Sequence, residues 1–442
     1  MRIAIVGSGI AGLTCAWLLH RRHNVTVFEA DPRIGGHSNT VILPIDGTEV
    51  PVDTGFMVYN EHTYPLLTRL FAHLQVPTAA TTMSFSASIG DGHVEYGGGS
   101  ARALLAQRRN ALRPRFLRML LDIHRFNRAG WRHLREEPAD GATVGEFLAR
   151  HRFGAGLADW YLMPMAAAIW SAPVARMRDY PARSFLRFFA NHGLLSVTGQ
   201  HAWRTVVGGS RSYVERLVSE FRPRIRLSTA ITSVCRRPWG VEVADERGER
   251  HLYDQVVLAC HADQTLAVLD DASEQERSLL SAFRYQPNRA FLHADPALMP
   301  HRRAVWSSWN YLSRSAADRE SAVSVTYWMN QLQSLPTARN VFVSLNPTRA
   351  PRPELVDAEF TYAHPIFDAA AVAAQARIGE IQGSGGVWHA GAWLGHGFHE
   401  DGVRSGFAVA KSLGMAPPWE AQTPQQLSGA MGLPEGAAAQ PA

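Results

Sequence analysis

The sequence predicts an α/β protein of two domains, in which a parallel sheet with helices is joined to a domain of antiparallel sheet and helices. Four observations lead to this prediction. Residues 2–6 form a β-branched apolar run that ends in a glycine-rich turn and a helix. A second apolar run, residues 25–28, ends in an acidic residue. Residues 323–329 and 341–345 alternate like antiparallel strands, and 442 residues exceed what one compact core usually holds.

The turn after the first strand has the glycine spacing that a dinucleotide pyrophosphate requires. Its residues are Gly7, Ser8, Gly9, Ile10, Ala11 and Gly12. Gly7 makes the tight turn, Gly9 lets the backbone approach the pyrophosphate, and Gly12 lets helix and strand pack closely. The N-terminus of the following helix offers free N–H groups and the positive end of its dipole to the phosphates. The segment predicts a Rossmann-like nucleotide site.

The second strand ends at Glu29, which is followed by Ala30. A carboxylate at this position can accept hydrogen bonds from both hydroxyls of the adenosine ribose, and its charge would repel a 2′-phosphate. NADP is therefore disfavoured, whereas NAD and FAD both remain open at this point. A plain glycine-rich turn is the alternative, and the strand, turn, helix, strand and acid in register argue against it.

A second glycine pair favours FAD. It lies in the run Ala30-Asp31-Pro32-Arg33-Ile34-Gly35-Gly36-His37-Ser38. A flavin dinucleotide continues past the pyrophosphate into a ribityl chain, and side chains at the pair would collide with that chain. An NAD site needs no such extension.

These elements resemble the flavoprotein superfamily of amine oxidases, phytoene desaturases and protoporphyrinogen oxidases, whose members share an RxGG element after the acid. Here that element is Arg33, Gly35 and Gly36, followed by His37 where the superfamily usually has arginine or a similar residue. The resemblance implies non-covalent FAD, with a covalent histidyl flavin at His37 as the alternative. It covers roughly residues 1–412.

The resemblance recurs in residues 386–406, which read as a strand, a glycine, a loop and a helix. It implies that Gly391, Phe398 and His399 line the cofactor, His399 through its backbone more than its side chain. In the superfamily this helix places its positive end under the flavin pyrimidine. His396 and His399 are candidates for catalytic bases. The alternative is that both are solvated loop histidines without a catalytic role.

Three further segments match the same superfamily. The loop 53–57 resembles the one that passes close to the isoalloxazine ring, so Gly55, Phe56 and Met57 are expected there. Residues 206–210 resemble its glycine turn before a helix. Ile231 matches the position at which backbone atoms hold the adenine.

The chain is therefore predicted to build its Rossmann-like FAD-binding domain from discontinuous segments. The predicted boundaries are 1–99, 202–287 and 348–415 for the FAD-binding domain, 100–201 and 288–347 for the substrate domain, and 416–442 for a mobile tail rich in Pro, Ala, Gln and Gly.

The two segments predicted to form the substrate domain differ in amino-acid composition. The first begins with arginines interleaved with leucines, and Pro114 interrupts it. This pattern suits an anionic membrane surface, or equally a packed helix pair with solvated arginines. Nucleic acid is disfavoured because no recognised nucleic-acid module accompanies the arginines. The second segment is aromatic and poor in charge, which favours an apolar substrate, although core packing explains many of these rings equally well.

The sequence contains no pattern typical of several other functional classes. The spacing of Cys15, Cys235 and Cys260 matches neither a metal site nor a disulfide scaffold, so no bound metal is expected. The predicted location is the reducing cytoplasm, with possible contact to a membrane surface. No apolar run is long enough to span a bilayer. No hydrolase triad or paired carboxylates stand out, so catalytic residues stay unassigned.

The single lysine of the chain, Lys411, argues against amine oxidation, because many amine-oxidising members hold a water at flavin N5 with a lysine. The runs VDTGFMVYNEHTYP, FLRFFANHGLL and GFHEDGVRSG, among others, look like a bacterial group of predicted NAD/FAD-binding proteins associated with cyclopropane fatty acid synthase-like enzymes. The leading hypothesis is desaturation or double-bond isomerisation of a fatty acyl chain by hydride transfer to flavin N5. The alternatives are an amine oxidase-type oxidase of a small molecule and a non-catalytic flavin-binding partner of a lipid-modifying enzyme.

Overall fold

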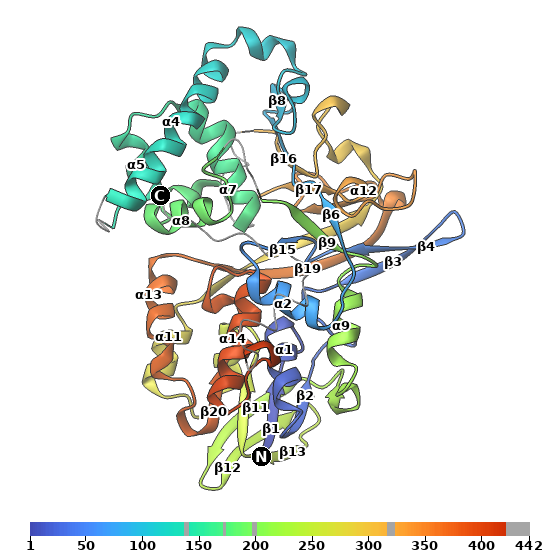
Figure 1. The fold of residues 1–442 in the computed structure, drawn as a ribbon, viewed down its shortest axis with the longest axis vertical. Coiled ribbons are helices and arrows are strands. Elements are labelled where there is room, and N and C mark those ends of the chain that lie inside the picture. Colours follow the sequence, from blue (N-terminus) through green and yellow to red (C-terminus); the bar gives the residue numbers. More distant parts are fainter. Residues whose placement is uncertain (137–140, 171–173, 197–200, 316–322, 421–442) are drawn as a thin grey trace, which may run out of the picture.

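Five parallel strands form the sheet in the lower part of Figure 1, in the order β10-β2-β1-β14-β20. The computed structural model describes residues 1–136, 141–170, 174–196, 201–315 and 323–420. The strands are β1 (Arg2–Val6), β2 (Asn24–Phe28), β10 (Ile225–Arg226), β14 (Gln255–Leu258) and β20 (Val387–His389). They come from three separated parts of the chain, which confirms the predicted α/β fold with a sheet built from discontinuous segments.

Alternate residues of β1 point into two different apolar cores. Ile3 and Ile5 pack with the helices α1 (Ile10–Leu19) and α14 (His399–Ser412). On the opposite face, Ala4 and Val6 pack with a small antiparallel sheet. Its strands are β11 (Ile231–Arg237), β12 (Gly240–Asp245) and β13 (Arg250–Tyr253). Both faces of the parallel sheet are therefore covered, as is typical of such sheets.

A seven-stranded sheet, in the order β19-β15-β18-β17-β16-β7-β8, forms the centre of the second part of the molecule. Its strands are β7 (Phe85–Ile89), β8 (Val94–Gly97), β15 (Arg284–His293), β16 (Trp309–Ser313), β17 (Val325–Trp328), β18 (Phe342–Leu345) and β19 (Val356–Ile366). All neighbours pair antiparallel except β16 and β7. In Figure 1, β15 and β19 cross between the two parts of the molecule.

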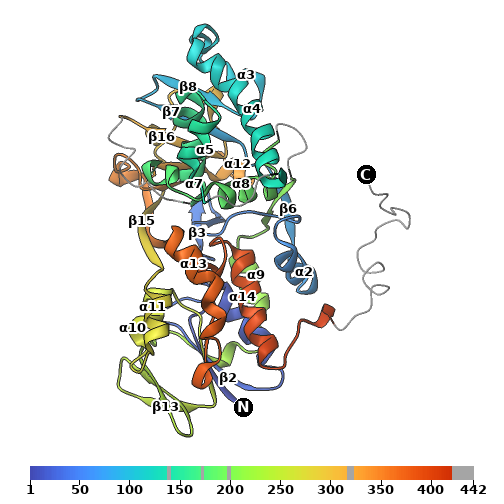
Figure 2. The same cartoon turned by 90° about the vertical axis from the view of Figure 1, so that its left-hand side faces the viewer.

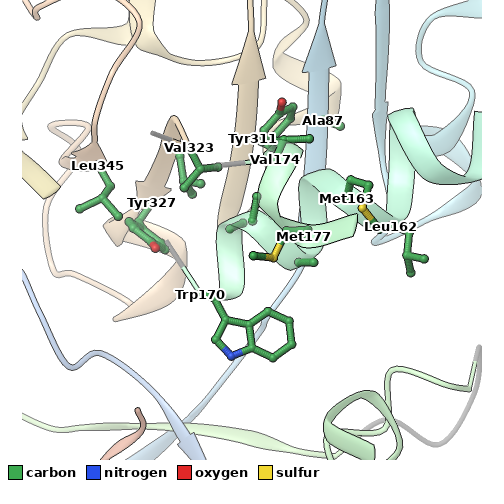
Figure 3. Packing of buried hydrophobic residues seen from close by; sticks show 14 of the residues in the cluster. Ala87, Leu162, Met163, Trp170, Val174, Met177, Tyr311, Val323, Tyr327 and Leu345 are labelled. Atoms are coloured by element: carbon green, nitrogen blue, oxygen red, sulfur yellow. The ribbon is translucent and has the colours of Figure 1, made fainter. Parts of the chain in front are cut away.

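Helices cover one face of this sheet (Figure 2). They are α4 (Pro114–Glu136), α5 (Val144–Arg150), α7 (Met163–Trp170) and α8 (Ala182–Asn191). Figure 3 shows Trp170 and Met163 of this layer near Tyr311 and Tyr327 of the strands, all within one buried apolar cluster. Pro114 begins α4, and the extended Arg113 before it separates α4 from the 3₁₀ turn Arg108–Leu112, so the predicted interruption at Pro114 is confirmed.

The pairing of three strands differs from the predicted domain boundaries. Strands β7, β8 and β19 were expected in the FAD-binding domain, and all three join the seven-stranded sheet. The physical reason is that alternation of apolar and polar residues predicts a strand but not its partner, which lies up to hundreds of residues away.

Residues 416–420 pack against the nucleotide-binding part and are not a mobile tail, contrary to the prediction. Pro418–Glu420 form a 3₁₀ turn in which Trp419 is buried, with its ring stacked 6.0 Å from Trp17. Glu420 also forms an ion pair with Lys411 at 2.8 Å. The composition around Trp419, rich in Pro and Ala, concealed this anchor. The rest of the predicted tail, residues 421–442, lies outside the described residues.

None of the helices within the described ranges combines the length and hydrophobicity that a bilayer crossing requires.

His293 of β15 should make folding sensitive to acid. The imidazole is fully buried, its Nδ1 accepts a hydrogen bond from the Asp295 N–H at 3.0 Å, and its Nε2 lies 2.7 Å from Ser344 Oγ. Burial lowers the pKa of His293 to about 4, from an ordinary 6.5. Between these values the unfolded chain binds a proton that the folded chain does not, so the free energy of unfolding decreases as pH falls, by about 1.4 kcal/mol per pH unit.

The measurement is urea unfolding of the wild type and of His293→Gln at several pH values between 7 and 4.5. Glutamine keeps a donor for Ser344 and cannot be protonated, so the wild type should lose stability more steeply on acidification. Parallel stability curves for the two proteins would contradict this assignment.

Candidate functional site

The glycine turn after β1 leaves open space in front of helix α1. Gly7 has φ +106° and donates its N–H to the Phe28 carbonyl at 2.8 Å. A Cβ on Gly12 would lie 2.0 Å from the Gly7 carbonyl oxygen, so helix and turn are in tight contact. A Cβ on Gly9, the N-cap of α1, would meet no atom within 4 Å. Ser8 and Ala11 are buried beside this space.

Glu29 is held beside the same turn. Its Oε2 accepts hydrogen bonds from Ser8 N at 2.9 Å and Ser8 Oγ at 2.6 Å, and its Oε1 accepts one from Asp31 N at 2.9 Å. Each carboxylate oxygen has two lone pairs, so Oε2 is fully used and one acceptor site remains on Oε1 for a ribose hydroxyl. The Glu29 carbonyl accepts from Thr229 N at 2.9 Å, two residues before Ile231, and Ala30 is exposed next to it.

The RxGG segment crosses directly over the glycine turn. Gly35 donates its N–H to the Ser8 carbonyl at 3.1 Å, and a Cβ on Gly36 would lie 3.2 Å from the Cα of Gly9. Two side-chain atoms here, Arg33 Nη1 and His37 Nε2, are buried and have no hydrogen-bond partner among the described residues. Buried polar atoms normally have partners, so these two indicate that a bound group completes the site.

The loop 53–57 and the start of α14 meet at His37. The Phe56 N–H donates to the His37 carbonyl at 2.8 Å, and a Cβ on Gly55 would lie 2.1 Å from that carbonyl oxygen. The Phe56 ring stacks on His399 with ring centres 3.7 Å apart. Met57, which follows, is buried in the core of the second part of the molecule.

Hydrogen bonds and burial hold the side chain of His399 in place. Its Nε2 lies 3.0 Å from Ser38 Oγ and 3.1 Å from the Tyr213 hydroxyl. Burial lowers the pKa of His399 to about 3, so the ring is neutral at physiological pH. The solvated loop histidine proposed as an alternative is therefore wrong for His399, because the fold packs this loop against Phe56.

The carboxyl-terminal segment lies against the glycine turn. Gly391 follows β20 and donates its N–H to Ser405 Oγ at 2.9 Å. A Cβ on Gly406 would lie 2.4 Å from the Ala11 carbonyl oxygen, so α14 is in close contact with α1. Phe398 is the N-cap of α14, and its N–H donates to Asp401 at 3.1 Å. The predicted site residues thus form one continuous region, although the sequence places Gly391 and Phe398 more than 350 positions after the turn.

Sequence reasoning missed a cluster of rings around His37. The His37 ring lies 5.1 Å from Tyr362, 5.5 Å from His364 and 6.3 Å from His261, which in turn stacks on Tyr285. Burial lowers the pKa of His37 well below its usual range and that of His364 to about 4. No local motif marks these residues, since they come from β15, β19 and the loop after β14. Among the described residues no group of His, Cys, Asp and Glu could hold a metal ion.

Phe398 marks the boundary between the nucleotide-binding and substrate parts. Its ring stacks on Phe188 of α8 at 5.3 Å, and it packs against the apolar cores of both parts. Two cavities, of about 370 and 220 Å³, lie elsewhere, near Tyr311 and near His301, and neither is lined by a predicted site residue.

Asp53 joins the loop 53–57 to both parts of the chain. Its carboxylate accepts hydrogen bonds from Ser210 N and Oγ, Thr40 Oγ1 and Gln333 Nε2, at 2.6 to 3.0 Å. Asp53→Ala leaves these buried donors unpaired and should lower the free energy of unfolding by roughly 3 kcal/mol. Thr40→Val removes one donor to Asp53 and the acceptor of the exposed Arg211 N–H, and should cost about 1 kcal/mol. Urea unfolding measures both, and equal losses would contradict the central role of the carboxylate.

These features fit FAD: open space at the N-terminus of α1, a half-exposed carboxylate after β2, a glycine crossing and two unpartnered buried nitrogens. The family described as flavin containing amine oxidoreductase matches residues 10–358. The chain belongs to this family. Members of the flavin-containing amine oxidoreductase family are FAD-dependent enzymes, so the predicted cofactor and the oxidoreductase class are confirmed.

Proteins similar to this chain are named for different activities. The Mycobacterium tuberculosis protein AofH, named for a flavin-containing monoamine oxidase, is 27% identical over 340 residues, which are 74% of this chain and 70% of AofH. The solved structure of putrescine oxidase bound to putrescine has a TM-score of 0.64 at 15% identity and covers 93% of this chain and 99% of that one. The CLA-producing fatty acid isomerase from P. acnes has a TM-score of 0.65 at 16% identity, covering 93% and 97%. The last two likenesses show the shared fold.

Proposed function

We propose that this flavoenzyme desaturates a fatty acyl chain or moves its double bond. The observation that carries the proposal is the position of Phe398, which follows the cofactor loop and stacks on Phe188 of the substrate helix α8. The two rings form an apolar contact where the cofactor-binding segments meet the substrate part. Binding of an alkyl chain to such a surface is favourable, because it removes apolar area from water and requires no polar partner.

The charges of the substrate part argue against an amine. Within the described residues of this part, the buried carboxylates have partners: Glu95 pairs with Arg302 at 2.6 Å, Asp122 with Arg118 at 3.1 Å, and Asp295 with Arg352 at 3.2 Å. A protonated amine that moves from water into a buried site needs a hydrogen-bond acceptor or a negative charge there.

The single lysine also lies away from the cofactor segments. Lys411 pairs with Glu420 and is twelve positions after His399 in α14, which corresponds to about 18 Å along a helix. It cannot hold a water near the residues that start this helix.

The residues of the chain act on the cofactor and on the substrate in different ways. The N-terminus of α1 at Gly9 would bind the pyrophosphate, and Glu29 the ribose. Arg33 and His37 would donate to the polar parts of FAD with their unpartnered nitrogens. Phe398 and Phe188 would orient the alkyl chain and exclude water. When bound, FAD supplies the hydride acceptor for desaturation, or an acceptor that returns the hydride during isomerisation.

The small molecules bound to the purified protein test this proposal. Mass spectrometry of a denatured extract should find FAD together with an unsaturated acyl lipid, and deletion of the gene should change the double-bond pattern of the cellular lipids. FAD alone, with an unchanged lipid profile, would count against the proposal.

Amine oxidation is the second candidate, favoured by the similarity to AofH. It requires rapid hydrogen peroxide formation with an amine. A third outcome follows from the resemblance to proteins associated with cyclopropane fatty acid synthase-like enzymes: stable co-purification with a lipid-modifying enzyme, without reduction of the flavin by any substrate, would indicate a non-catalytic partner.

A further inference from the structure

Helix α4 and the segment just before it carry an unusual concentration of exposed apolar side chains. Among the described residues, eight large apolar side chains are exposed, and five of these lie in the segment 105–131. They are Leu105, Leu112, Leu117, Leu121 and Trp131, exposed by 42%, 85%, 45%, 68% and 41%. The segment includes the 3₁₀ turn Arg108–Leu112 and most of α4. Isolated exposed leucines are ordinary, whereas a group on one helix indicates a contact surface.

The spacing of these residues places them on one side of the helix. Leu121 follows Leu117 by four residues and Trp131 by ten more, so the three side chains fall within about 80° of the helix circumference. Arg128 and Arg132 lie on the same side. The opposite side of α4, with Phe116, Met119 and Phe126 among others, is buried in the core. We call Leu117, Leu121, Trp131, Arg128 and Arg132 the outer face of α4.

Five arginines of α4 fall into two groups. Arg115 pairs with Asp159 at 2.8 Å and Arg118 with Asp122 at 3.1 Å, and Arg125 also contacts Asp122, so these three support the packing of α4. Arg128 and Arg132 have no carboxylate within ion-pair distance among the residues that the structure describes. Residues 101–136 contain ten arginines and two acidic residues, one of which, Asp122, is buried. The outer face of α4 is therefore both apolar and positively charged.

We infer that the outer face of α4 docks on the surface of an anionic phospholipid membrane. A helix in this position inserts leucines and tryptophan at the boundary between head groups and acyl chains, while arginines contact the head groups. Nucleic acid offers no apolar layer for the leucines. A neutral protein surface would not need the unpaired arginines.

The position of α4 in the fold agrees with this role. Figures 1 and 2 both place α4 at the end of the molecule remote from the parallel sheet. Its buried side continues into the aromatic core of the substrate part. The ring centres of Phe126 and Phe189 lie 6.5 Å apart, and the neighbouring Phe188 stacks on Phe398. One layer of helices thus separates the proposed membrane surface from the cofactor segments.

Vesicle flotation of the full-length flavoprotein tests this inference. The wild type should float with vesicles of equal parts phosphatidylcholine and phosphatidylglycerol, and not with phosphatidylcholine alone, and high salt should weaken the binding. Leu117→Ser with Leu121→Ser, and separately Arg128→Glu with Arg132→Glu, should each lower the vesicle affinity roughly tenfold or more. The thermal midpoints should stay near that of the wild type, since these side chains are exposed.

Two matched controls lie in the nucleotide-binding part. Trp239→Ser removes a side chain that is 71% exposed, and Arg222→Glu with Arg247→Glu changes the net charge as much as the α4 arginine pair does. Both controls should bind vesicles like the wild type. No flotation of the wild type, or equal losses in the controls, would overturn the inference. Self-association that the leucine pair abolishes, without any vesicle binding, would instead assign the surface to a second copy of this chain.

The inference does not depend on the proposed reaction. Vesicle binding is measured without turnover, so it can stand if no acyl substrate reduces the flavin, and it can fail if one does.

Discussion

A Gly9→Glu variant should purify as a folded protein that contains no FAD. The site of substitution is open, because a Cβ on Gly9 would meet no atom within 4 Å and its φ of −69° suits any residue. The new carboxylate would occupy the space for the pyrophosphate in front of α1 and repel it. The same negative charge is favourable for the helix itself, since it lies at the positive end of the dipole. Loss of the cofactor should therefore be complete while the fold is kept.

Visible absorbance and circular dichroism measure the two effects separately. Gly379→Glu is a matched control, because a Cβ at Gly379 also meets nothing within 4 Å and this glycine is exposed. The control should retain one FAD per chain. Stoichiometric FAD in Gly9→Glu would show that the pyrophosphate binds elsewhere.

A Gly12→Val variant should fail to accumulate as folded protein. A Cβ there would lie 2.0 Å from the Gly7 carbonyl oxygen and 3.1 Å from Ala259 Cβ, and both neighbours are held by the central sheet. Neither can move without separating β1, β14 and α1, so the cost should reach or exceed about 4 kcal/mol, the range of the most damaging single substitutions. Soluble yield and thermal midpoint in excess FAD are the measurements, with Gly379→Ala as the control. A folded Gly12→Val protein of normal midpoint would contradict the tight contact.

The contrast between Gly9 and Gly12 also shows what the sequence could predict. The turn, the acid at Glu29 and the crossing at Gly35 involve fewer than forty consecutive residues, and their glycine spacing follows from the shape of a dinucleotide. The role of residues near Phe398 required resemblance to a family, because the chain returns to the turn only after more than 350 residues.

Other features depend on long-range packing and could not be predicted. Nothing near His261 or His364 in the sequence indicates that they lie next to His37, since this proximity is created by the pairing of β15 with β19. The same limitation explains why β7 and β8 were expected in the other domain. Trp419 was missed because the Pro- and Ala-rich residues around it gave no sign of the partner, Trp17.

The most direct test of the proposed function is anaerobic mixing of the FAD-loaded protein with unsaturated phospholipid vesicles, followed by flavin absorbance and by mass spectrometry of the acyl chains. The proposal predicts bleaching of the flavin or a moved double bond with the lipid, and neither bleaching nor peroxide formation in air with simple amines. An oxidised flavin and unchanged acyl chains, with rapid bleaching by an amine, would contradict it.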